Sequence, residues 1–146
     1  MKKDYTPQEY NEYVSQKSPK SRIVRDTVVA FLTGGAICFV AQIISNVLAS
    51  FGISGEIVKK AIPVIMIFIG SFLTGINVYG ALGKFCGAGT IVPITGFANS
   101  IVSSAMEFKS EGFVTGLAVK MFSVAGPVIV YGTIVSVLIG IVYYIL

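Results

Sequence analysis

The sequence predicts an all-α integral membrane protein, a bundle of about three to four spanning helices with a broken or re-entrant Gly/Pro-rich segment. Of its 146 residues, 54% are hydrophobic and only 12% are charged, and the mean hydropathy is +0.82. No ordinary soluble domain keeps this balance on its surface, so the outside must face lipid. We expect a polar N-terminal segment over 1–26 and one membrane domain over 27–146. The chain is too short to carry a separate soluble enzyme domain as well.

The N-terminal segment combines a helix start with basic residues. Thr6-Pro7-Gln8-Glu9 is a capping box with proline at the first helical position. This pattern predicts a short interfacial helix within 5–18, with a disordered tail as the alternative. Basic residues that precede a first span stay in the cytoplasm and can contact anionic headgroups, so the N-terminus is expected there. No nucleic-acid partner is expected, because no folded basic domain accompanies these residues. They are Lys2, Lys3, Lys17, Lys20, Arg22 and Arg25.

The first span is predicted over 27–51, a run without a single charged residue. Gln42 and Asn46 lie four residues apart in it, so their amides share one face of the helix. An amide that faces lipid lacks a hydrogen-bond partner, and this face is therefore expected to point into the bundle. There the two amides would either hold helices together or contact a solute, and both interpretations stay open.

The second span is predicted over 61–82, after a turn at 51–56 and the basic pair Lys59 and Lys60. It contains Asn77. The following stretch, 83–100, is too rich in glycine and proline for an uninterrupted helix, yet no charged residue occurs from Gly87 to Met106. Irregular backbone at membrane depth is tolerated only where it is buried in protein or lines a wet cavity. We expect a broken or re-entrant helix over about 87–108, loop first and helical from about Thr95, with a water-exposed loop as the alternative.

The last third of the chain begins with a charged interruption at 106–111, which should reach a membrane interface. The apolar run over 112–146 is too long for one simple span, and Gly126-Pro127 is its expected break. The expected elements are a half-length helix over about 112–124 and a final span over 128–146. The expected interface charges are Glu107, Lys109, Glu111 and Lys120.

Catalysis is not expected from this sequence. The chain has no histidine, so the usual general base and the best zinc ligand are both missing. Cys38 and Cys86 form no C-x-x-C pair, and neither a metal site nor a cofactor is predicted. Glu107 and Glu111 lie one helical turn apart, but no nucleophile accompanies them.

A helix that starts near Thr95 inside the membrane presents free N–H groups and a partial positive charge. Flanking lysines add to this charge, which favours an anionic solute. The candidates for contact with the solute are the polar, glycine and proline residues of this segment and the amides of the two spans. They are Lys84, Gly87, Gly89, Pro93, Thr95, Asn99, Gln42, Asn46 and Asn77.

The same segment carries a family resemblance. Gly87-Ala88-Gly89 followed by Val92-Pro93-Ile94-Thr95-Gly96-Phe97-Ala98-Asn99 closely resembles the G-A-G-x-x-V-P-[IV]-T-x-F-x-N signature of the stage V sporulation protein AC/AE family. The similarity extends through Lys109-Ser110-Glu111-Gly112 and through Gly35, Cys38, Gln42 and Asn46. The polar N-terminal segment and the Lys-Ser-Glu-Gly run are more similar to the AC branch than to the shorter AE branch.

The resemblance implies a protein of the inner spore membrane that belongs to an assembly with the AD and AE proteins of the same group. It implies that the assembly moves dipicolinate, a small dianion, with its calcium into the developing spore and releases it in germination. For the AC branch it also implies a channel gated by membrane tension. A scaffold subunit without a pore of its own is the alternative, in which the glycines serve only helix packing. A pore needs more helices than one chain supplies, so homo- or hetero-oligomers are expected.

Overall fold

A computed structural model describes residues 6–18 and 22–146. Over these ranges the regular structure is entirely helical, and three helices are long and apolar enough to cross a membrane: Ile23–Ser50, Gly55–Gly75 and Phe113–Ile145. This confirms the prediction of an all-α membrane protein. Of the basic residues used above to orient the chain, Lys2, Lys3 and Lys20 lie outside the described residues.

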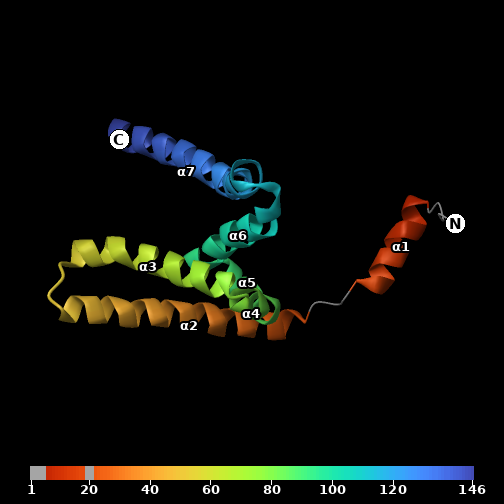
Figure 1. Cartoon of the computed structure of the whole chain (residues 1–146), viewed down its shortest axis with the longest axis horizontal. Helices are drawn as coiled ribbons and strands as arrows, with labels where there is room; N and C mark the ends of the chain where they lie inside the picture. The colour runs from red at the N-terminus through yellow and green to blue at the C-terminus, as the bar shows by residue number, and fades with distance from the viewer. Residues whose placement is uncertain (1–5, 19–21) are drawn as a thin grey trace.

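Helix α1 spans Pro7–Lys17 and stands apart from the other helices (Figure 1). The capping box is present. The Thr6 N–H donates to Glu9 Oε2 at 2.9 Å, and the Glu9 N–H donates to Thr6 Oγ1 at 3.4 Å. The hydrogen bonds from the Thr6 backbone and side chain lower the pKa of the Glu9 carboxyl below its usual value. The local sequence thus specifies this helix without any help from the bundle.

Helices α2, Ile23–Ser50, and α3, Gly55–Gly75, form an antiparallel hairpin (Figure 1). The turn between them includes Gly52, whose φ of +79° suits a residue without a Cβ. Helix α2 begins at Ile23 rather than at Thr27, so the charged residues Arg25 and Asp26 lie in its first turn. A membrane helix can extend past the hydrocarbon in this way, because its polar end lies among headgroups.

The second predicted span is corrected by the structure. Helix α3 begins already at Gly55 and ends at Gly75, and a separate helix α4 follows over Val78–Cys86. The break is at Asn77, whose φ of 61° and ψ of 15° are left-handed helical. Asparagine adopts this conformation more readily than most residues that carry a Cβ, which explains the change of direction at this position.

The Gly/Pro-rich segment forms a helical hairpin of two unequal arms. Helix α5 covers Ala88–Ile91 and packs on α2, and helix α6 covers Ile94–Glu107 and packs along α3. A Cβ on Gly34, near the middle of α2, would lie 3.6 Å from the Gly89 carbonyl oxygen. Helix α5 therefore reaches well into the bundle, and α6 returns toward the end where α2 begins (Figure 1). A short helix thus precedes the break, where the sequence predicted only loop.

The predicted break at Gly126-Pro127 is wrong. A π-helical turn over Phe113–Ala118 continues directly into α7, Val119–Ile145, with Pro127 inside it. A proline removes one hydrogen bond from a helix, and the rest of the ladder remains. The chain changes direction at Gly112 instead, where φ is +108° after the short 3-10 turn Lys109–Glu111.

Glycine at position 70 is required by the close approach of α6 to α3, which gives a testable prediction. A Cβ on Gly70 would lie 2.8 Å from the Thr95 carbonyl oxygen, whereas a Cβ on Gly75 meets nothing within 4 Å. We expect Gly70→Ala to lower the stability of the detergent-solubilised protein by about 1–3 kcal/mol. Gly75→Ala is the control in the same helix. Equal thermal-unfolding midpoints for the two variants would contradict this packing.

Candidate functional site

The break between α5 and α6 is held by the phenol of Tyr79, a buried residue of α4. Its hydroxyl donates to the Thr90 carbonyl oxygen at 2.8 Å and lies 2.7 Å from Thr95 Oγ1. Thr90 is the penultimate residue of α5, and Thr95 is the second residue of α6. Each hydroxyl has one proton, so the Thr95 hydroxyl can donate to Tyr79 while Tyr79 donates to Thr90.

A second polar contact joins α3 to α6. Thr74 Oγ1 lies 2.9 Å from Asn99 Oδ1 and 2.7 Å from the Gly70 carbonyl oxygen, and Thr74 is buried. Asn99 itself is half-buried. The two predicted site residues Thr95 and Asn99 therefore lie on the side of α6 that faces α3 and the Tyr79 hydroxyl.

The other predicted residues of this segment shape the backbone. Gly87 has a φ of 53° and a ψ of −128°, a conformation suited to glycine, and it reverses the chain after α4. A Cβ on Gly89 would overlap Ala30 and the Thr33 hydroxyl of α2. Pro93 precedes α6 in extended conformation and provides no side-chain hydrogen bond to its first turn. The first N–H groups of α6 thus receive no side-chain cap.

Two cavities lie beside α2, on the side where the end of α4 and the α5–α6 hairpin approach it. The first, the mouth cavity, has a volume of about 720 Å³ and is lined by Asp26, Lys84 and Gly87 among others. The second, the central groove, has a volume of about 490 Å³ and is lined by Cys38, Gly89 and Pro93 among others. Both are also lined by Ala30, Phe31 and Ala88, so they follow one another along α2. Together the mouth cavity and the central groove form what we call the track, which runs from the charged residues Asp26 and Lys84 toward the middle of α2.

Three predicted site residues lie away from this track. Asn77 is exposed at the α3–α4 break. Gln42 and Asn46 bond to each other, Gln42 Nε2 to Asn46 Oδ1 at 2.9 Å, and both side chains are exposed. The expectation that they point into the bundle of one chain is wrong, because α3 and α5 pack on other sides of α2.

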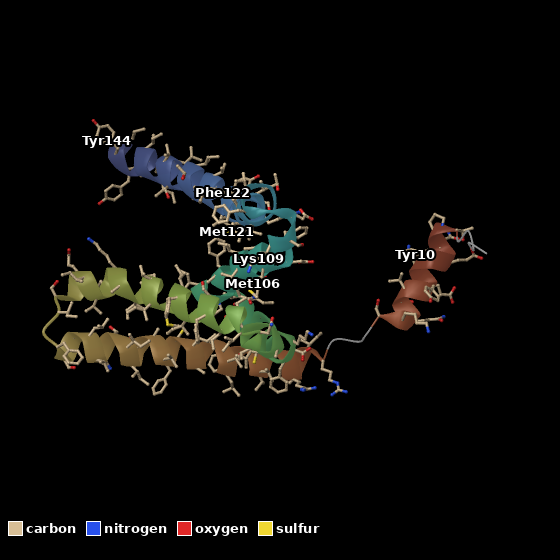
Figure 2. All side chains as sticks on the ribbon, viewed as in Figure 1. Tyr10, Met106, Lys109, Met121, Phe122 and Tyr144 are labelled. Atoms are coloured by element: carbon tan, nitrogen blue, oxygen red, sulfur yellow. The ribbon has the colours of Figure 1, made fainter. Side chains whose placement is uncertain are left out.

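The predicted interface charges gather at the elbow between α6 and α7. Glu107, Lys109 and Glu111 are exposed there, and Figure 2 shows Met106 and Lys109 at the end of α6 beside Met121 and Phe122 of α7. Lys120 is half-buried, and its ammonium lies 3.8 Å from the centre of the Phe108 ring. This cation–π contact ties the start of α7 to the end of α6.

Sequence reasoning missed Tyr79, Thr90 and Thr74. Tyr79 resembles any aromatic residue of an apolar helix, and only the return of the chain at 87–95 brings two oxygens to its hydroxyl. In residues 6–18 and 22–146, no group of three or more His, Cys, Asp or Glu is arranged to hold a metal ion.

Comparison with known proteins identifies the family. The model of the SpoVAC/SpoVAEB sporulation membrane proteins matches residues 26–142. The chain belongs to this family. It is also 40% identical over 136 residues to the stage V sporulation protein AC of Bacillus subtilis (strain 168), covering 92% of this chain and 91% of that one. No solved structure matches it. The chain is therefore a sporulation membrane protein of the SpoVAC/SpoVAEB family, and the family match includes the whole α5–α6 hairpin.

The phenol of Tyr79 is predicted to stabilise the hairpin. Tyr79→Phe leaves a buried carbonyl and a buried hydroxyl without their partner, so we expect a loss of about 1–3 kcal/mol in unfolding free energy. Tyr143→Phe is the matched control, because Tyr143 is 86% exposed. Thermal unfolding in detergent measures both variants. A Tyr79→Phe protein as stable as the control would show that this hydrogen bond contributes little.

Proposed function

We propose that this SpoVAC/SpoVAEB family member is a channel or transport subunit for a small anion, with dipicolinate and its calcium as the solute. The proposal places it in the inner spore membrane, in dipicolinate uptake during sporulation and release during germination, with membrane tension as the gating signal. Family membership and three helices of spanning length support a role in a sporulation membrane. The solute follows from the family resemblance together with the chemistry of the hairpin.

The observation that carries the proposal is the α5–α6 hairpin beside two adjacent cavities that share Ala30, Phe31 and Ala88 in their linings. The mouth cavity begins at Lys84, and the central groove ends at Pro93, next to the uncapped start of α6. A lysine at one end and a helix N-terminus at the other both attract an anion. Irregular backbone at membrane depth is tolerated where it is buried in protein or lines a wet cavity, and the second case fits a pathway.

The mouth cavity offers both signs of charge. Lys84 suits a carboxylate of the solute, and Asp26 provides an oxygen ligand of the kind that calcium prefers. A dianion that travels with calcium would find a partner for each component there. The central groove beyond it has a largely apolar lining that includes Phe31 and Val92, so charge selection falls to the mouth cavity and the α6 terminus.

The track of a single chain covers only the half of the span nearest the start of α2. Neighbouring subunits would complete the path, whether further copies of this chain or the AD and AE proteins of the group. The scaffold alternative is favoured by one observation. Gly70, Gly89 and Gly96 each lie too close to a neighbouring backbone to carry a Cβ, which explains their identity without any pore.

Flux measurements distinguish the two functions. We expect the purified chain in proteoliposomes to release dipicolinate, and Lys84→Gln to reduce the initial rate about two- to fivefold, the effect of one exposed charge interaction. Asn99→Ala should also reduce it, because α6 then loses the contact with Thr74 that helps to hold it against α3. Dipicolinate outside the liposomes is measured by its luminescence with terbium.

Lys59→Gln is the matched control, because Lys59 is an exposed lysine in the first turns of α3, at the end of that helix away from α4 and Lys84. Equal rates for the wild type and the Lys84 and Asn99 variants would show that the solute does not pass along Lys84 and the α5–α6 hairpin. No flux from a fully inserted wild-type chain would favour the scaffold function, or a pore that other subunits supply.

The fold also predicts a topology. We expect helices α2, α3 and α7 to cross the membrane, because each is long and apolar enough to do so. Helices α4 to α6 then enter and leave at one end of the bundle, where α7 begins (Figure 1). Three crossings place the C-terminus outside if the basic N-terminus is cytoplasmic. Alkaline phosphatase fused after Leu146 should be active, and a fluorescent protein fused there should be dark. A fluorescent C-terminal fusion would require either a fourth crossing or an N-terminus on the outside.

A further inference from the structure

The exposed face of α2 carries a feature that the single chain leaves unexplained. Gln42 and Asn46 lie in the second half of a helix of 28 residues that qualifies as a membrane span. Among the described residues, the only hydrogen bond of their side chains joins one to the other. Helices α3, α4 and α5 all contact other sides of α2, so both amides face outward on the surface of a helix of spanning length.

These amides differ from two exposed hydroxyl groups of α7. Thr133 and Ser136 of α7 donate to carbonyl oxygens of their own helix, at 2.8 Å and 2.7 Å, and so satisfy their hydroxyl protons. A carboxamide has two N–H donors and an acceptor oxygen. One bond between Gln42 and Asn46 leaves three N–H groups and the Gln42 oxygen without a partner. Each unpaired group in hydrocarbon costs several kcal/mol.

The surface around the amides permits close approach of another helix. Gly35 and Cys38 lie one to two turns before Gln42 in the same sector of α2, and both are exposed. A Cβ on Gly35 would meet nothing within 4 Å. In Figure 1, α2 is the outermost helix of the α2–α3 hairpin, with no helix on its far side. Small residues at such a face let two backbones come near enough for side-chain amides to bond across the contact.

We propose that this α2 face, defined by Gly35, Cys38, Gln42 and Asn46, pairs with the same face of a second copy of the chain. Every copy inserts with the same orientation, so two α2 helices related by an axis along the membrane normal run parallel. Gln42 and Asn46 of one copy then lie at the depth of those of the other. A carboxamide both donates and accepts, so this face is complementary to itself, as a two-fold interface requires. The proposal does not depend on the transported solute.

The chain contains its own reporter for this contact. Cys38 lies on the proposed face, whereas Cys86 is buried between α4 and its neighbours. Oxidation with copper phenanthroline in liposomes of low protein content should yield a disulfide-linked dimer of the wild type and of Cys86→Ala. Cys38→Ser should yield none. As a measure of random collision, Val64→Cys in the Cys38→Ser background places a thiol on an exposed site of α3, and it should crosslink far less.

Removal of the amides tests the hydrogen bonds directly. Gln42→Leu with Asn46→Leu keeps the side-chain size, and we expect it to weaken dimerisation about five- to thirtyfold by energy transfer between labelled chains. Thr133→Val with Ser136→Ala is the matched control and should leave dimerisation unchanged. A dimer of undiminished affinity in the leucine variant, or no dimer of the wild type, overturns the proposal. The proposal is also overturned if the Cys38 disulfide forms no faster than the Val64→Cys disulfide. The same holds if the Cys38 disulfide forms only when a different protein is present in the liposomes.

Discussion

A chain that leaves the helical conformation inside a membrane must supply partners for its own polar groups, and this constraint organises the α5–α6 hairpin. The segment from Gly87 to Pro93 interrupts the helix ladder, and Tyr79 provides the hydroxyl that meets the carbonyl of Thr90 and the side chain of Thr95. In the described ranges, every buried side-chain nitrogen and oxygen has a hydrogen-bond partner. These hydrogen bonds favour one conformation of the α5–α6 hairpin, since a conformation that left the buried polar groups unpaired would cost several kcal/mol for each group.

The same constraint explains the shape of the site. Glycines at 70, 89 and 96 let α5 and α6 approach α2, α3 and each other closely enough for these hydrogen bonds. The track along α2 then remains beside the hairpin, with a charged mouth cavity at Asp26 and Lys84. Packing and pathway are thus two consequences of one arrangement, which is why the scaffold and channel functions of a SpoVAC/SpoVAEB protein need a flux measurement to separate them.

Assembly follows from the groups that the single chain leaves unsatisfied. Within the bundle, Thr74 and Asn99 lie together on adjacent helices. On the outside of α2, Gln42 and Asn46 have only one another. If a second copy covers that face, Gln42 and Asn46 lie against protein, as Asn99 does within the bundle. The central groove, which includes Cys38, would border such an interface.

The sequence by itself determined the membrane class, the capped helix α1, the first span and the presence of a broken segment near Pro93. Apolar runs, caps and Gly/Pro density act over neighbouring residues, so they can be read without a fold. The break predicted at Gly126-Pro127 is wrong, because a helix tolerates the loss of one hydrogen bond at a proline. The sequence around Gly112 carries no signal strong enough to predict the change of direction there instead. Only the tertiary structure decided which residues meet. The partners of Tyr79 come from the return of the chain, and the outward direction of Gln42 depends on which sides of α2 the other helices occupy.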